Sequence, residues 1–219
     1  MAADASYPLQ LRLPSARELA ADGAVHLVGL CLGLPAAVAV VVVAALGGTP
    51  GQLAPVALYA AGLAAMIGCS AAYNLARRTR WRDWLQRFDH AAIFAMIAGT
   101  YTPFTLRLER AWSLGLTAAI WSVAVLGIAA KLARLSHIDR VSVVLYLTLG
   151  WIGLVAAGPF MASMATSTLL LLAGGGALYS TGVVFHLWHR LPYQNAIWHG
   201  FVLAAAGVHY FAVLTVLDV

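Results

Sequence analysis

Seven long apolar runs separated by short polar segments dominate the chain. They lie at about 24–46, 53–76, 89–106, 112–131, 141–159, 167–188 and 194–216. Each run is close to the ~17–25 residues that an α-helix needs to cross a bilayer. The pattern therefore predicts an all-α fold, a seven-transmembrane helix bundle occupying residues 24–219. In the preceding segment, 1–23, Ser15 and Glu18 have the spacing of a capping box, which favours a short amphipathic helix before the membrane.

The composition supports a membrane protein. Hydrophobic residues make up 62% of the 219 residues, charged residues only 10%, and the mean hydropathy is +0.85. Soluble globular domains carry about 25% charged residues. These values predict an integral membrane protein with no room for a large soluble domain. The net charge of +5 does not by itself indicate nucleic acid, because basic residues in a membrane protein mark its cytoplasmic loops.

The distribution of basic residues predicts the orientation. Eleven of the thirteen lie before the first run or in the loops that follow the second, fourth and sixth runs. Arg107 and Arg110, in the loop after the third run, lie on the other side. The positive-inside rule then places the N-terminus in the cytoplasm and the C-terminus outside.

Several polar residues of the apolar runs lie at one predicted depth, near the cytoplasmic ends of the helices. They are His26, Ser70, Asn74, Asp89, His90, Asn195 and His199. An ionisable side chain in hydrocarbon needs a partner or a wet cavity, so we expect Asp89 to face a polar cavity rather than lipid. The simpler alternative is that Asp89 caps the N-terminus of its helix.

Two pairs in this set have helical spacing. Ser70 and Asn74 are four residues apart, as are Asn195 and His199, so each pair shares one helix face. By this spacing one helix can offer two ligands or two hydrogen-bonding groups to a single point. The same residues could instead join packed membrane helices through hydrogen bonds, and spacing alone leaves both interpretations open.

One of these segments resembles a known family. The run FDHAAIFAMIAGTYTPF, from Phe88 to Phe104, closely resembles the signature of the bacterial haemolysin III family, which belongs with the progestin and adipoQ receptors. The E…H…G pattern from Glu18 to Gly29, and Asn195-Ala-Ile-Trp-His199 near the C-terminus, resemble the first and last helices of that family. The resemblance implies seven helices, a cytoplasmic N-terminus, a zinc site near the cytoplasmic face and location in the bacterial inner (plasma) membrane.

The resemblance also implies which residues form the zinc site. The metal-ligand positions are Asn74, Asn195 and His199, with Ser70 and Asp89 beside them as catalytic residues and Asp89 holding the metal-bound water. Two of the three ligand positions therefore carry Asn where the family pattern has His. Zinc in proteins takes Cys, His or carboxylate ligands, and a neutral amide oxygen is a weak donor for it. The sequence predicts that zinc is absent or weakly bound here, replaced by a network in which Asn donates to Asp89 and accepts from His199.

Three functions remain after these arguments. The preferred one is a role without metal, in membrane-state regulation or lipid sensing. The alternative is a zinc-dependent membrane hydrolase of a lipid amide, with Asp89 as the base. The third is a pore or transport protein. The sequence argues against this function, because the charges lie at one face and no polar stripe crosses the bilayer. The expected partner is a membrane lipid and not nucleic acid, and the sequence leaves the oligomeric state open.

Overall fold

The computed structural model of the chain describes residues 13–49, 51–134 and 136–217, and for residues 136–140 it describes the backbone alone. The predicted all-α architecture is confirmed, because this part of the chain forms helices and no strand. The elements are α1 (Ala16–Gly47), α2 (Leu53–Leu75), α3 (Arg82–Thr105), α4 (Arg110–Leu132), α5 (Ser136–Gly150), the 3-10 helix η1 (Ile152–Ala156), α6 (Ala157–Ser163), α7 (Thr166–Leu187) and α8 (Gln194–Leu214).

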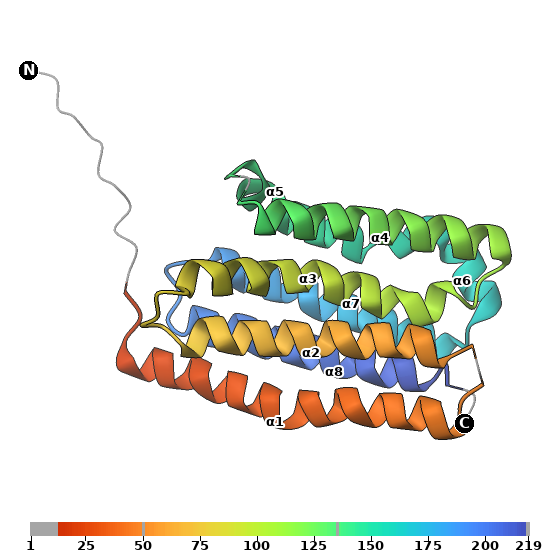
Figure 1. The fold of residues 1–219 in the computed structure, drawn as a ribbon, viewed down its shortest axis with the longest axis horizontal. Coiled ribbons are helices and arrows are strands. Elements are labelled where there is room, and N and C mark those ends of the chain that lie inside the picture. The colour runs from red at the N-terminus through yellow and green to blue at the C-terminus, as the bar shows by residue number, and fades with distance from the viewer. Residues whose placement is uncertain (1–12, 50, 135, 218–219) are drawn as a thin grey trace, which may run out of the picture.

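The helices form one bundle of seven spans, with α5, η1 and α6 together making the fifth (Figure 1). In the described part of the chain, six spans are long and apolar enough to cross a membrane. The remaining span, α3, is less apolar because Arg82, Asp83, Arg87 and Asp89 occupy its first turns. α1 and α8 both begin at one end of the bundle and both finish at the other, as an odd number of spans requires (Figure 1).

The first helix begins at Ala16, earlier than the predicted start at residue 24. The predicted capping box is present: Glu18 N donates to Ser15 Oγ (3.3 Å) and Ser15 N donates to Glu18 Oε2 (2.7 Å). This capping box forms the N-terminus of the long helix α1 rather than of a separate short helix, and α1 continues without a break past residue 24. Glu18, Asp22 and His26 recur every fourth residue and are all buried, so they extend the packed face of the helix. Residues 1–12 of the predicted cytoplasmic segment lie outside the described part, and the cytoplasmic placement of that segment stays a prediction.

The fifth span is not one regular helix. Pro159 has no N–H, and its ring clashes with the carbonyl four residues earlier, which disfavours a regular helix in this region, although α1 and α3 continue through Pro35 and Pro103. Tyr101 of α3 bonds to the broken backbone: its hydroxyl donates to Gly150 O (2.5 Å) and accepts from Gly153 N (3.1 Å). The tyrosine of the segment from Phe88 to Phe104 thus holds α3 against the fifth span.

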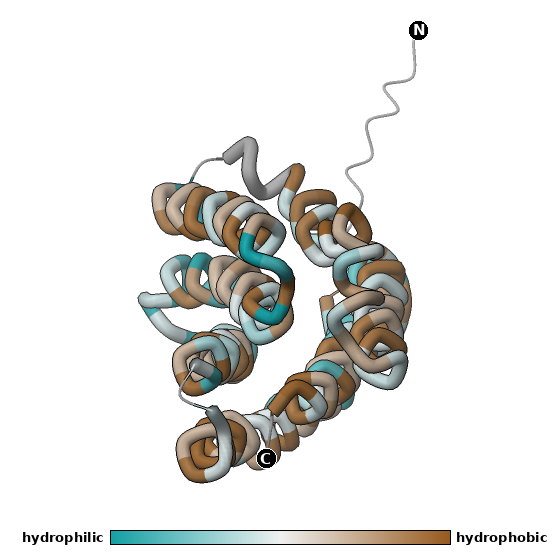
Figure 2. The backbone as a smooth tube through the Cα atoms, turned by 90° about the vertical axis from the view of Figure 1, so that its right-hand side faces the viewer, coloured by the Kyte–Doolittle hydropathy of each residue, from teal (hydrophilic) through white to brown (hydrophobic). Residues whose placement is uncertain are grey.

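At one edge of the bundle, α1 packs against α2 and α8 (Figure 1). In the view along the bundle, apolar positions predominate on all the tubes (Figure 2). α1 contacts both α2, which runs antiparallel to it, and α8, which runs parallel to it. The start of α1 therefore lies beside the end of α2 and the start of α8. These are the helix ends on which the candidate site is built.

Candidate functional site

A cavity of about 920 Å³ lies inside the bundle and receives residues from all seven spans. Its lining is mainly apolar along the middle of the helices. Charged and polar side chains are most concentrated where α2 ends and where α3 and α8 begin, and Thr100, Ser180 and His209 add polar groups farther along the cavity. All five site residues predicted from the sequence line this cavity: Ser70, Asn74, Asp89, Asn195 and His199. The structure thus brings the five predicted side chains to one cavity, and their shared depth in a membrane stays a prediction.

The hydrogen bonds at this end differ from the predicted network. Asn74 Nδ2 donates to the backbone oxygen of Ser70 (3.0 Å), within its own helix. The Ser70 side chain is hydrogen-bonded to the Asp89 carboxylate. Across the described residues, no hydrogen bond joins Asn74 or Asn195 to Asp89 or His199. The structure thus brings Ser70 and Asp89 together, and Asn74 Nδ2 also donates to Ser70 Oγ over 3.5 Å.

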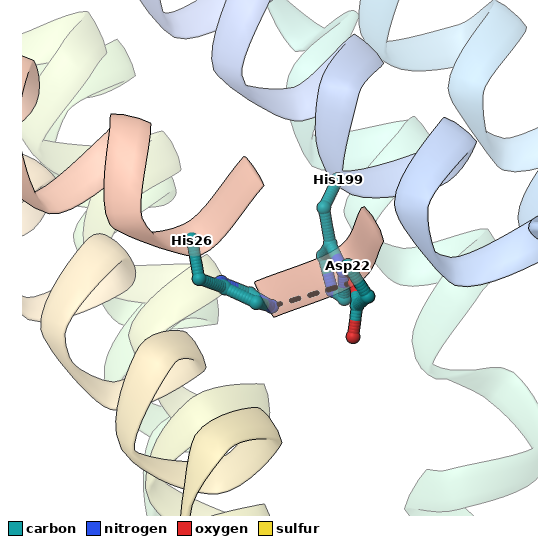
Figure 3. A group of neighbouring side chains, drawn as sticks. All are labelled: Asp22, His26 and His199. Atoms are coloured by element: carbon teal, nitrogen blue, oxygen red, sulfur yellow. Dashed lines mark hydrogen bonds and ion pairs between the residues drawn. The ribbon is translucent and has the colours of Figure 1, made fainter. Parts of the chain in front are cut away.

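His199 contacts Asp22 of α1 instead. His199 Nδ1 donates to Asp22 Oδ1 over 2.6 Å, and His26 Nε2 lies 3.6 Å from the same oxygen. The rings of His26 and His199 have centroids 4.4 Å apart. Figure 3 shows the His26 ring directed at Asp22, beside His199. One donor atom from each of the three residues lies within 4.8 Å of the other two, which makes this group a candidate metal site.

Arg77, just after α2, holds the other oxygen of Asp22. Its Nη2 lies 3.4 Å from Asp22 Oδ2, and its Nε donates to Asn74 O over 2.8 Å. The Asp22 side chain is 2% exposed, so this is a buried carboxylate with a cation on one oxygen and imidazoles at the other. Such a charge is stable inside a protein only when it is paired and hydrogen-bonded.

The zinc implied by the family resemblance can be tested against these side chains. Two imidazoles and one carboxylate are ligands that zinc prefers. His26 Nε2 is buried, and none of the described residues hydrogen-bonds to it, so it is available to coordinate. Bonds of ~2.0–2.1 Å in a tetrahedral site put two ligand atoms about 3.3 Å apart. The 3.6 Å between His26 Nε2 and Asp22 Oδ1 is close to that value, whereas the 2.6 Å contact between His199 and Asp22 is a hydrogen bond that would have to open. With that adjustment the residues fit a metal.

The structure adds ligands that the sequence prediction on zinc does not include, and whether zinc binds stays a prediction. The sequence prediction counts His199 as the single histidine ligand beside two amides. It places His26 among the polar helix ends without a spacing argument for it as a ligand, and it places Asp22 in the segment before the membrane. The missed signal is their spacing of four residues, the same spacing that singled out Ser70 and Asn74.

Comparison with known proteins identifies the family. A family model described as "Haemolysin-III related" matches residues 18–210. The chain belongs to the haemolysin III family. Since the match begins at Glu18, it includes Asp22 and His26. Together with its apolar spans, membership makes this haemolysin III protein an integral membrane protein.

Individual relatives agree with this assignment. The protein named "Hemolysin-3 homolog" of Bacillus subtilis (strain 168) is 33% identical over 199 residues, covering 90% of this chain and 93% of the relative. "Hemolysin-3" of Bacillus cereus is 33% identical over 201 residues, covering 90% and 91%. The human "Monocyte to macrophage differentiation factor" is 31% identical over 165 residues, covering 71% of this chain and 67% of the relative. This last similarity fits the relationship to progestin and adipoQ receptor-like proteins.

Proposed function

We propose that this haemolysin III protein binds an amphiphilic membrane lipid in its internal cavity and acts in membrane-state regulation or lipid sensing. The observation that carries the proposal is the cavity itself. Its volume of about 920 Å³ lies at the upper end of the range, ~300–1,000 Å³, found for small-molecule sites. Apolar walls with a few convergent polar groups at one end match a molecule that has an acyl chain and a polar head.

The polar head decides which lipid is selected. An acyl chain that leaves the bilayer for an apolar cavity gains little, because lipid tails are as apolar as the side chains that replace them. Ser70, Asp89 and His199 offer a hydroxyl, a carboxylate and an imidazole at the cavity end. A lipid head with both a donor and an acceptor, such as an amide or a hydroxyl group, would satisfy these side chains.

A pair of neighbouring valines on α7 provides a matched test. Val183 lines the cavity, whereas Val184 is 60% exposed on the outside of the bundle. We expect Val183→Trp to fill the cavity and weaken binding of a fluorescent N-acyl amide lipid by at least about tenfold, which is 1.4 kcal/mol. Val184→Trp should bind the probe like the unmodified protein. Equal affinities for the two variants, measured by fluorescence titration in detergent, would refute lipid binding in this cavity.

A second candidate function, hydrolysis of a lipid amide, is favoured by one specific observation. Asp89 and Ser70 lie beside the cluster of Asp22, His26 and His199, at the polar end of a cavity of lipid size. Bound there, a metal ion would supply Lewis-acid activation of water and of the amide carbonyl. Asp89 would take the proton from the attacking water, and Ser70 would keep that carboxylate oriented through their hydrogen bond.

The orientation in the plasma membrane is part of the same proposal. With eleven of thirteen basic residues on one side, we predict that the loop between α2 and α3 is cytoplasmic and that the C-terminus is external. A single cysteine introduced at Thr79 should resist a membrane-impermeant thiol reagent in intact cells, while one at Asp218 should react. Labelling at position 79 from outside the cell would show that the protein has the opposite orientation.

A further inference from the structure

We propose that Asp22, His26 and His199 form a divalent-metal site, with α1 supplying two of the three ligands. In the family pattern, the corresponding ligands come from the second helix and from the first turn of the last helix. Those two positions are Asn74 and Asn195 here, and only His199 is common to both arrangements. The structure thus assigns the metal to a different set of side chains, displaced toward α1.

The state of His26 is the first argument. This residue is only 6% exposed, and within the described parts of the chain its buried Nε2 atom has no hydrogen-bond partner. Burying a polar atom without a partner is unfavourable, by about 1–3 kcal/mol. The ring nevertheless points at Asp22 and His199 (Figure 3). A metal ion between these residues would provide the missing partner.

The charges of the neighbouring side chains are the second argument. The carboxylates of Asp22 and Asp89 lie close enough to interact electrostatically. Arg77 contacts Asp22, and the neutral Ser70 hydroxyl bonds to Asp89. Buried charges in proteins are either paired or bound to metals, and a divalent cation beside both carboxylates would offset their repulsion.

The anchoring of α1 is the third argument. Glu18 Oε1 accepts a hydrogen bond from Tyr193 N over 2.8 Å, which fixes the first turn of α1 to the segment just before α8. Asp22 and His26 follow at intervals of four residues on the same face. The ligands from α1 are thereby held beside His199, and a metal site needs this kind of positioning by groups outside the ligands.

Metal binding here goes beyond lipid binding and does not depend on it. Two imidazoles and one carboxylate suit zinc or cobalt rather than calcium or magnesium, which prefer oxygen ligands. Coordination would replace the hydrogen bond between His199 Nδ1 and Asp22 Oδ1. Arg77 stays on the second oxygen of Asp22, so it acts as a positioning residue.

Cobalt binding to the purified, chelator-treated protein tests the proposal. We expect about one Co²⁺ per chain, a visible absorption band typical of a low-coordinate site, and a higher melting temperature with metal than without. His26→Gln should weaken Co²⁺ binding by more than about 100-fold, because even changes outside the ligands of a metal site cost 10–100-fold. Without metal, this variant should melt near the unmodified protein, since His26 Nε2 makes no hydrogen bond there.

Two control variants separate the possible outcomes. His189→Gln changes an exposed histidine between α7 and α8 and should leave Co²⁺ affinity unchanged. Asn74→Ala removes a ligand position of the family pattern and should also leave it unchanged. Fewer than about one-tenth Co²⁺ per chain, or unmodified affinity in His26→Gln, would overturn the proposal. If Asn74→Ala weakened Co²⁺ binding and His26→Gln did not, the result would indicate that the metal binds at the ligand positions of the family pattern.

Discussion

Asp22→Ala is expected to lower the free energy of unfolding by about 3–5 kcal/mol, the range measured when one partner of a buried ion pair is removed. The substitution removes a carboxylate that is 2% exposed, and it leaves the largely buried Nδ1–H of His199 without its acceptor, whereas the Arg77 side chain is 33% exposed and can reach solvent. For a chain of this length, the loss corresponds to a fall in melting temperature of roughly 10 °C. Asp22→Asn keeps the shape of the side chain and should have a smaller effect in the same direction.

Asp83→Ala is the matched control for this prediction. Asp83 also pairs with an arginine, Arg134 at 3.7 Å, but the two side chains are 69% and 68% exposed. Exposed ion pairs contribute little to stability, so the melting temperature should hardly change. Equal melting temperatures for Asp22→Ala and Asp83→Ala, measured in the same detergent, would show that Asp22 is not the buried centre of an ion-pair cluster.

Gly99→Ala should also destabilise the protein, although alanine is the better helix former. A Cβ atom at Gly99 of α3 would lie 2.8 Å from Leu58 O and 3.3 Å from Tyr59 Cα, both backbone atoms of α2. Neither can move aside, so the two helices must separate. Overpacking of this kind typically costs about 1–3 kcal/mol. Because α2 carries Ser70 and α3 carries Asp89, separation would also disturb the hydrogen bond between them.

Gly68→Ala on α2 is the control, since a Cβ atom there meets nothing within 4 Å. It should leave the melting temperature unchanged or raise it, because Ala is favoured over Gly in a helix by about 1 kcal/mol. Gly99→Ala should lower the melting temperature and Gly68→Ala should not, and this difference separates the effect of close helix packing from that of helix propensity. A melting temperature for Gly99→Ala at or above that of Gly68→Ala would contradict the tight contact of α2 and α3.

Much of the bundle could be predicted because the bilayer sets the length of an apolar helix. The predictions failed where side chains rather than lipid determine the structure. Hydropathy placed the start of the first helix at residue 24, since Glu18 and Asp22 are charged. The helix starts earlier because both residues are buried against other helices and have partners there. Likewise, the apolar run at 141–159 does not indicate that the hydroxyl of Tyr101, on another helix, would hydrogen-bond to backbone groups at the break in the fifth span.

The candidate site was predicted in part for the same reason. Ser70, Asn74, Asp89, Asn195 and His199 could be placed together because helix ends at one depth must lie near one another. Which of them touch depends on the rotation of each helix, and a single sequence does not determine this. The contact of His199 with Asp22 rather than with an asparagine is such a case. Treating the four-residue spacing of Asp22 and His26 like that of Ser70 and Asn74 would have included α1.

If the proposals are right, one bundle holds a lipid in its cavity and a metal ion at the cavity's polar end. Native mass spectrometry of the intact protein, released from mild detergent after incubation with zinc and bacterial lipid extract, measures both ligands at once. We predict a species carrying one lipid and one zinc ion. Val183→Trp should lose the lipid and keep the metal, whereas His26→Gln should lose the metal and keep the lipid. Detection of the unmodified protein with neither ligand, or of the same bound ligands in both variants, would contradict the binding of a lipid and a metal ion at these two places.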